Sequence, residues 1–179
     1  MSNDFELKLT PPAGNIPDSD TWATPAWIVE WVRETAGWPA FDFDPACVPA
    51  TAKAPDYICP DTGDGLWDPW RGSTVWLNPP YSKQALWLAR AARECRLEGR
   101  RVAALVMPSF DAIYWRSTVW QEAAEVWLIE GRIAFEMDGE PRPGGNVRSC
   151  VVIYDPALSI GPNGPRVKYL RPSPKGGEQ

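Results

Sequence analysis

The stretch Thr74-Val75-Trp76-Leu77-Asn78-Pro79-Pro80-Tyr81 decides how this chain folds and where its chemistry lies. Residues 74–77 are β-branched or apolar and predict a short buried strand, which the tetrapeptide 78–81 follows directly. In open α/β folds, ligands bind at the carboxyl ends of the strands. The stretch therefore predicts an α/β fold with a binding site around Asn78 and Tyr81.

The tetrapeptide offers hydrogen-bond acceptors beside an aromatic ring. Its two prolines remove two backbone donors, which leaves the Asn78 side-chain oxygen and the Pro79 carbonyl as acceptors next to Tyr81. Two acceptors on the N–H bonds of an aryl amine favour a pyramidal nitrogen, whose lone pair can attack an electrophilic methyl carbon. We infer a site that methylates the amino group of a nucleobase. The alternatives are an ordinary Asn-Pro turn, a strand stop or a polyproline ligand.

The composition indicates one globular domain. The chain has 179 residues, of which 44% are hydrophobic, enough for a real core. No apolar run is long enough for a transmembrane helix, and the N-terminus lacks a secretory signal, so we expect a cytoplasmic protein without a membrane partner. The net charge is 18 − 23 = −5. This disfavours a protein that coats nucleic acid but allows transient DNA contact through a local basic patch.

The chain has no histidine and only four widely spaced cysteines, Cys47, Cys59, Cys95 and Cys150. We therefore expect reduced, mostly buried thiols and no metal site. The usual general base is also missing. Methyl transfer tolerates this, because the methyl donor is already activated and the catalytic need is positioning.

Hydrophobic periodicity predicts alternating helices and strands. Helices are expected from Thr24-Pro25 to Gly37, from a Ser82 cap to Glu98, and from an Asp111 cap to Ala124. Strands are expected at 41–44, 74–77, 101–107, 125–130, 133–137 and 149–154; the last two form an antiparallel edge pair. Strand 74–77, the helix after it and strand 101–107 form a βαβ unit with parallel strands. Residues 1–21 are an irregular arm, 22–156 the domain, and 157–179 a loosely ordered tail.

A methyl donor needs polar partners of its own. S-adenosylmethionine has an amino-acid end, a ribose and an adenine. Thr24, at a helix N-terminus, can meet a carboxylate, Asp44 can accept from an ammonium group, and Asp64 can accept from the adenine amino group with Leu66 beside the ring. Each also has a simpler explanation, because Thr24 can be only a helix cap, and Asp44-Pro45 and Asp64-Gly65 can be only turns. The absence of Gly-x-Gly-x-x-Gly leaves nicotinamide and flavin cofactors unsupported.

In these pieces the chain resembles the phage-type (Dam-like) DNA N6-adenine methyltransferases, a family within the Rossmann-like S-adenosylmethionine-dependent methyltransferases. The resemblance implies a three-layer α/β sandwich with a mainly parallel seven-stranded sheet and an antiparallel edge strand. It also implies S-adenosylmethionine as donor and adenine N6 in DNA as acceptor. The matching pieces, in the family's order, are Trp22-Ala23-Thr24-Pro25, Asp44-Pro45-Ala46-Cys47, Asp64-Gly65-Leu66, Asn78-Pro79-Pro80-Tyr81-Ser82 and Gly131-Arg132-Ile133-Ala134-Phe135.

The resemblance also implies residue roles. It assigns the tetrapeptide (Asn78, Pro79, Pro80 and Tyr81) to the target base, with Asn78 also bordering the cofactor. The donor's methionine end falls to Thr24-Pro25 and Asp44-Pro45-Ala46, and its adenine to Asp64 and Leu66. One departure from better-known adenine methyltransferases is that Cys47-Val48-Pro49-Ala50 replaces the usual glycine-rich turn. Asp56 and Asp61 are the candidates for the ribose contact.

Adenine within a duplex hides its amino group, so the base has to be flipped out at a cost of roughly a few kcal/mol. Stacking on Tyr81 offsets about 1–3 kcal/mol of this cost. The phosphates can meet basic side chains on and after helix 82–98, although a solvated helix face is the favoured explanation of these side chains. They can also meet the loop 136–148, which carries Arg142 and Arg148. The alternatives are methylation of cytosine N4, RNA adenine or protein glutamine, and a non-catalytic DNA-binding protein of the same fold. The basic side chains on and after helix 82–98 are Arg90, Arg93, Arg96, Arg100 and Arg101.

Most tryptophans fit the predicted core better than contacts with nucleic acid. The seven assigned to the core are Trp27, Trp31, Trp76, Trp87, Trp115, Trp120 and Trp127.

Overall fold

The computed structural model describes residues 22–137 and 139–173, with the side chains of 142–146 left out. Seven strands form one sheet in the order β2-β1-β3-β4-β8-β5-β9. The pairs β1–β2, β1–β3, β3–β4 and β5–β9 are parallel, and β8 is antiparallel to both of its neighbours. The strands are β1 Phe43–Asp44, β2 Asp56–Tyr57, β3 Thr74–Leu77, β4 Arg101–Val106, β5 Glu125–Ile129, β8 Cys150–Tyr154 and β9 Arg166–Leu170.

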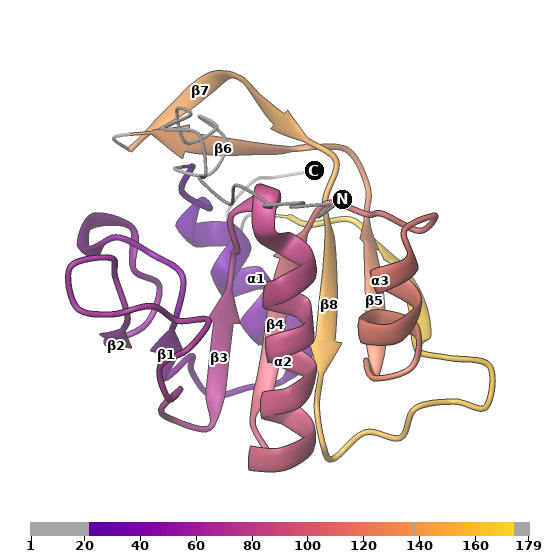
Figure 1. Ribbon diagram of the computed structural model, residues 1–179. Helices are drawn as coiled ribbons and strands as arrows, with labels where there is room; N and C mark the ends of the chain where they lie inside the picture. Colours follow the sequence, from indigo (N-terminus) through magenta and orange to yellow (C-terminus); the bar gives the residue numbers. More distant parts are fainter. Residues whose placement is uncertain (1–21, 138, 174–179) are drawn as a thin grey trace, which may run out of the picture.

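Helices cover both faces of the sheet, which confirms the three-layer α/β class (Figure 1). Side chains alternate between the faces of a strand, so β3 and β4 present different residues to each layer. Trp76, Ala103 and Leu105 pack with α1 (Ala26–Ala36) on one face, while Val75, Leu77 and the even-numbered residues of β4 pack with α2 (Gln84–Glu98) on the other. The predicted βαβ unit β3-α2-β4 is confirmed.

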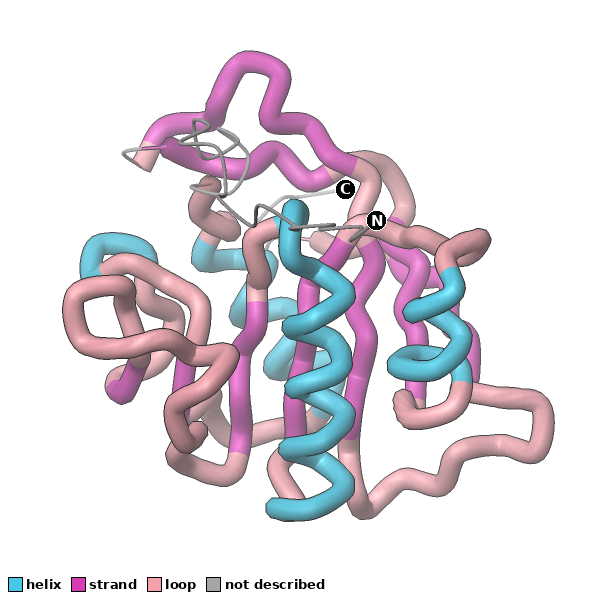
Figure 2. The backbone as a smooth tube through the Cα atoms, in the orientation of Figure 1, coloured by secondary structure: helices cyan, strands magenta, loops and turns pink. Residues whose placement is uncertain are grey.

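The antiparallel strand lies inside the sheet and not at its edge. We expected β6 (Ile133–Met137) to pair with β8, but this was wrong, because β6 pairs with β7 (Glu140–Val147) in a separate two-stranded sheet. All five residues of β8 are buried, whereas β6 exposes one of its faces. A continuously apolar strand needs neighbours on both sides, and the sheet interior supplies them. Figure 2 shows the hairpin of β6 and β7 standing apart from the main sheet, above the carboxyl ends of its parallel strands.

Two segments expected to be irregular form strands. Residues 140–147 of the predicted loop 136–148 are β7, and residues 166–170 of the predicted tail are β9, parallel to β5. Mostly exposed residues form β9, which therefore lacks a strand-like apolar pattern. Ion pairs hold it instead: Glu125 of β5 contacts Lys168 at 2.6 Å and Arg166 at 3.2 Å. The predicted arm 1–21 and residues 174–179 of the tail lie outside the described residues.

The helix ends were predicted better than the helix starts. Gly37 and Gly99 end α1 and α2 with φ angles of 70° and 69°, in the left-handed region that glycine tolerates. Thr24 is not the cap of α1, because Pro25 occupies that position without a side-chain hydrogen bond. Ser82 does not cap α2 either: a 3₁₀ turn, Tyr81–Lys83, precedes it. A second 3₁₀ turn, η2, spans Pro49–Thr51.

The third predicted helix is shorter than expected. It comprises α3 (Ile113–Trp115) and the π-helical turn Arg116–Trp120, and Asp111 is not its cap. The assignment of tryptophans to the core was wrong for Trp27 and Trp120, which are 38% and 40% exposed. No helix in the described ranges is long and apolar enough to cross a membrane.

Candidate functional site

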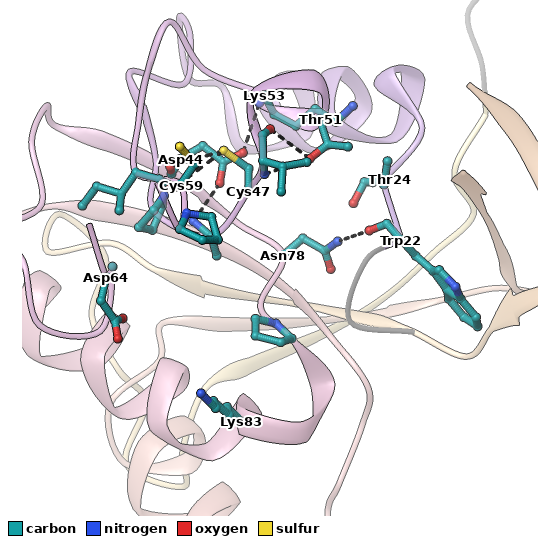
Figure 3. A pocket seen from close by; sticks show the side chains of 18 of the residues that line it. Trp22, Thr24, Asp44, Cys47, Thr51, Lys53, Cys59, Asp64, Asn78 and Lys83 are labelled. Atoms are coloured by element: carbon teal, nitrogen blue, oxygen red, sulfur yellow. Dashed lines mark hydrogen bonds between the residues drawn. The ribbon is translucent and has the colours of Figure 1, made fainter. Parts of the chain in front are cut away.

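A cavity of about 720 Å³ opens at the carboxyl ends of β1 and β3, where the sequence places the site. Its size suits a cofactor-sized small molecule. Figure 3 shows side chains from four separate segments around it. The predicted site residues among its lining are Thr24, Asp44, Pro45, Ala46, Asp64, Asn78 and Pro80.

Asp44 is the buried acid of this cavity. It ends β1 with 2% of its surface exposed, and the chain folds back around it through η2. Its carboxylate accepts hydrogen bonds from the backbone N–H groups of Ala46 at 3.2 Å and Lys53 at 3.0 Å. Burial raises the pKa of Asp44 to about 6, although the two N–H groups lower it. A cationic ligand next to Asp44 would offset the cost of burying its charge and favour the ionised carboxylate.

Asp64 lies across the cavity on a loop that approaches Asp44's loop closely. A Cβ atom on Gly65 would stand 2.1 Å from the Pro45 carbonyl oxygen and 2.8 Å from the Trp87 ring. Only glycine permits such an approach. The Gly65 carbonyl also accepts a 2.6 Å hydrogen bond from the Trp70 indole. The Asp-Gly pair is therefore a turn that packing requires, and it brings Asp64 to the cavity wall.

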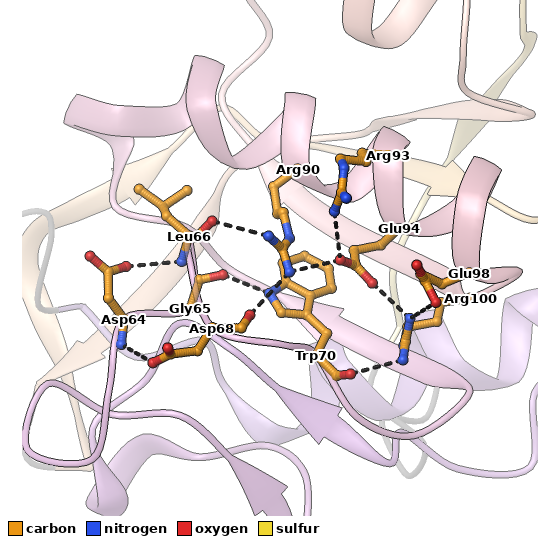
Figure 4. Close-up of polar contacts among 10 residues, drawn as sticks. All are labelled: Asp64, Gly65, Leu66, Asp68, Trp70, Arg90, Arg93, Glu94, Glu98 and Arg100. Atoms are coloured by element: carbon orange, nitrogen blue, oxygen red, sulfur yellow. Dashed lines mark hydrogen bonds and ion pairs between the residues drawn. The ribbon is translucent and has the colours of Figure 1, made fainter.

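A buried ion network supports the same loop (Figure 4). Glu94 of α2, with a side chain only 3% exposed, pairs with Arg90 at 2.8 Å and Arg100 at 2.7 Å. These two arginines also donate to the backbone carbonyls of Leu66, Asp68 and Trp70. The network thus ties residues 66–70 to α2 and holds the wall that carries Asp64.

The basic cluster on α2 is therefore largely engaged within the protein. Arg96 pairs with Glu122 at 2.5 Å and Arg93 approaches Glu94 at 3.7 Å. Arg101 lies 3.9 Å from Asp155. These contacts favour the structural explanation of the cluster over the phosphate-binding one.

Asn78 presents an unsatisfied acceptor at the cavity. Its Nδ2 donates to the Trp22 carbonyl at 3.3 Å, so its Oδ1 points away from that carbonyl (Figure 3). Oδ1 is buried and has no hydrogen-bond partner in the described part of the chain. Leaving a buried acceptor unpaired costs about 1–3 kcal/mol. An unpaired buried acceptor at a cavity is a candidate to accept a hydrogen bond from a ligand.

Thr24 carries a second buried group of this kind. Its side chain is 1% exposed, and its hydroxyl has no partner among residues 22–137 and 139–173. Because the hydroxyl does not cap α1, it remains available to a ligand in the cavity, which Thr24 lines. Thr24 therefore lies at the cavity, although its predicted role as the cap of α1 is wrong.

Four predicted site residues do not line the cavity: Pro25, Leu66, Pro79 and Tyr81. Leu66 packs against the core beside α2. Tyr81 is half-buried, with its ring edge-on to Phe135 of β6 at 6.2 Å. Burial raises the pKa of its phenol, so it remains protonated. Of the ribose candidates, Asp56 is paired with Arg71 at 2.6 Å, and neither Asp56 nor Asp61 lines the cavity.

Several lining residues were not predicted. Lys83 follows the tetrapeptide closely, and that proximity was a usable signal. Lys53 lies in an aperiodic stretch that gave none. Cys47 also lines the cavity, but burial raises the pKa of its thiol, which makes it a poor nucleophile. No group of residues that could hold a metal ion occurs in the described ranges.

Taken together, the cavity has an acid and a buried amide oxygen at the ends of the adjacent parallel strands β1 and β3, and a buried hydroxyl from the segment before α1. These groups can hold a ligand that bears a cation and a carboxylate, and can accept hydrogen bonds from an amino group next to it. The arrangement therefore suits transfer chemistry that depends on orientation.

Comparison with known proteins gives consistent results. The sequence profile of the family described as DNA N-6-adenine-methyltransferase (Dam) matches residues 14–164. A DNA N-6-adenine-methyltransferase of Haemophilus phage HP1 is 26% identical over 146 residues, which cover 80% of this chain and 83% of the phage protein. A protein of the same description from Escherichia phage T1 is 26% identical over 129 residues, 70% of this chain and 52% of its own length. No solved structure matches the chain significantly.

Proposed function

Since the chain belongs to the DNA N-6-adenine-methyltransferase (Dam) family, we propose that it transfers a methyl group from S-adenosylmethionine to the N6 nitrogen of a flipped-out adenine. Adenine-specific DNA methylation follows from the family. The donor, the flipped base and the residue roles are our proposals. The main support for these proposals is the Oδ1 of Asn78, a buried acceptor without a hydrogen-bond partner in the described residues, in a side chain that lines a cofactor-sized cavity.

The donor fits the cavity through its charged end. Asp44 would accept from the ammonium group of S-adenosylmethionine, and this cation would offset the burial of the carboxylate. The Thr24 hydroxyl would donate to the donor's carboxylate. Asp64, on the far wall, would accept from the donor's adenine amino group. When bound, S-adenosylmethionine supplies an activated methyl group.

The target adenine would be held by the tetrapeptide. Asn78 Oδ1 and the Pro79 carbonyl would accept the two N–H bonds of N6 and leave its lone pair directed at the methyl carbon. The base would stack on Tyr81, outside the donor cavity and against the hairpin of β6 and β7. The extra proton passes to solvent, because the product amine is a weak base. A general base is therefore not required of these residues.

The duplex would approach the carboxyl edge of the sheet. Lys83, exposed at the cavity rim, and Arg148, exposed at the end of the hairpin, are cations available there for phosphate contact. We propose the hairpin as the DNA-contacting element in place of the cluster on α2, whose charges are paired within the protein.

A transfer assay with methyl-labelled S-adenosylmethionine tests this function. The protein is incubated with duplex DNA, RNA and a protein mixture, and the labelled products are hydrolysed and separated. We expect label in N6-methyladenine from DNA. Label in N4-methylcytosine, RNA or glutamine would contradict the substrate assignment, and absence of donor binding by calorimetry would indicate a non-catalytic DNA-binding protein. Long-read mapping of modified adenines in cells that express the chain would then give the target sequence.

A further inference from the structure

The fold brings together two of the sequence pieces named above, residues 22–25, which include the proposed donor-binding Thr24, and residues 131–135. Ala23 donates to the Glu136 carbonyl and accepts from the Glu136 N–H, both at 2.9 Å. The Trp22 ring packs on Phe135 with centroids 6.1 Å apart. Ala23 therefore forms an isolated antiparallel bridge to β6, and we call residues 22–24 the strap.

The strap reaches the tetrapeptide from the other side. The Trp22 carbonyl accepts the hydrogen bond from Asn78 Nδ2. Phe135, 1% exposed, contacts the strap through Trp22 and the tetrapeptide through Tyr81, whose ring meets it edge-on at 89°. The hairpin is thus connected to both ends of Asn78–Tyr81, by the strap at Asn78 and directly at Tyr81.

This connection determines which way the Asn78 amide faces. Its nitrogen is a donor and its oxygen an acceptor, and the two lie on opposite sides of one rigid group. A flipped amide would bring Oδ1 against the Trp22 carbonyl oxygen, where two acceptors repel. The carbonyl therefore selects the orientation in which Oδ1 is free for a ligand.

We propose that the strap is a positioning element for methyl transfer: the Trp22 carbonyl orients Asn78, and the hairpin of β6 and β7 holds that carbonyl in place. Trp22, which also lines the cavity, and Phe135 are positioning residues that act through Asn78 and Tyr81. The proposal rests on the proposed function of Asn78. It also implies that contact of the hairpin with DNA acts on the tetrapeptide through the strap.

Two variants loosen the strap in different ways. Ala23→Pro removes the donor to Glu136 and places a ring carbon against its carbonyl, and Phe135→Leu removes the aromatic contacts with both sides. Ala134→Ser, on the exposed face of β6, is the matched control. In both strap variants we expect kcat to fall about fivefold or more, the equivalent of one neutral hydrogen bond. In Phe135→Leu the Kd of S-adenosylmethionine should stay within about twofold of wild type. In Ala23→Pro donor binding should weaken as well, because Ala23 lines the donor cavity next to Thr24. The control should retain wild-type values.

The Asn78 side-chain amide gives a second readout. Its Nδ2 proton signals in ¹⁵N-asparagine-labelled protein are assigned by their loss in Asn78→Ala. We expect these signals to be protected from solvent exchange in wild type and Ala134→Ser, and exposed in Phe135→Leu. Unchanged kcat and unchanged amide signals in Phe135→Leu would contradict the positioning role of the strap, even if Ala23→Pro fails to fold. If wild type transfers no methyl group, the proposed function fails, while the amide signals still decide on the strap.

Discussion

Binding of S-adenosylmethionine should weaken steeply below a pH of about 6, because Asp44 accepts the donor's ammonium group only when ionised. Burial raises the pKa of Asp44 from 3.8 to about 6 in the free protein. One pH unit below its pKa, roughly one tenth of a carboxyl group is ionised. We therefore expect the Kd to be about tenfold higher at pH 5 than at pH 7.5.

The same group acts on the stability of the free protein with the opposite sign. The pKa of Asp44 is higher in the folded state than the ordinary 3.8 of the unfolded chain. Its contribution is therefore fully present below pH 3.8 and is lost as the pH rises through about 6. The difference of about two pKa units corresponds to about 3 kcal/mol. Through Asp44, low pH thus stabilises the folded protein without ligand, whereas neutral pH favours the protein with bound S-adenosylmethionine.

Isothermal calorimetry between pH 5 and 7.5 at constant ionic strength measures this dependence. The upper limit keeps most of the donor's α-amino group protonated, since such groups titrate near about 7.7–8.0. Asp44→Asn serves as the control and should bind weakly with a flat pH profile. An equal Kd at pH 5 and pH 7.5 in the wild-type protein would refute the role of Asp44.

Three further substitutions test the other walls of the cavity. Thr24→Val removes a buried hydroxyl without a described partner, so denaturation should show no loss of stability while calorimetry shows donor binding about tenfold weaker, as for a hydrogen bond to a charged group; undiminished binding would exclude Thr24 as a ligand. Gly65→Ala forces a methyl group against the Pro45 carbonyl and should destabilise the fold by about 1–3 kcal/mol, with loss of donor binding; a variant that binds normally would show that the two loops can separate. Glu94→Ala leaves Arg90 and Arg100 buried without their carboxylate and should lower the free energy of unfolding by about 3–5 kcal/mol, whereas a rise in DNA affinity at unchanged stability would restore the phosphate-binding role of the cluster.

The sequence predicted the part of the fold with strong local signals. The strand 74–77, the helix after it and the glycines at 37 and 99 were read correctly, because apolar periodicity and left-handed helix ends are local properties. β9 was not predicted, because ion pairs with Glu125 hold it in place and its own residues have no apolar pattern. β8 was found but misplaced, because strand order depends on contacts between distant residues.

The site was predicted in the same uneven way. Asp44, Asp64 and Asn78 converge on one cavity because each follows or approaches the carboxyl end of a parallel strand, a rule that sequence can use. Leu66 was expected beside the donor's adenine but packs against the core beside α2. Tyr81 was expected at the target base, and its ring meets Phe135 outside the cavity. Side-chain direction after a strand depends on the packing of other elements, here the β6–β7 hairpin and α2. The pairing of the strap with β6 likewise joins residues more than a hundred positions apart.

The most direct test of the account compares wild type with Asn78→Ala in single-turnover transfer of a labelled methyl group to duplex DNA. Calorimetry on the same preparations measures binding of S-adenosylmethionine. We expect wild type to label adenine N6, and the variant to bind the donor yet lose about a hundredfold or more in rate, as when one preorganised hydrogen-bonding group is removed. Transfer at the wild-type rate by Asn78→Ala would contradict the claim that this amide oxygen activates the adenine amino group.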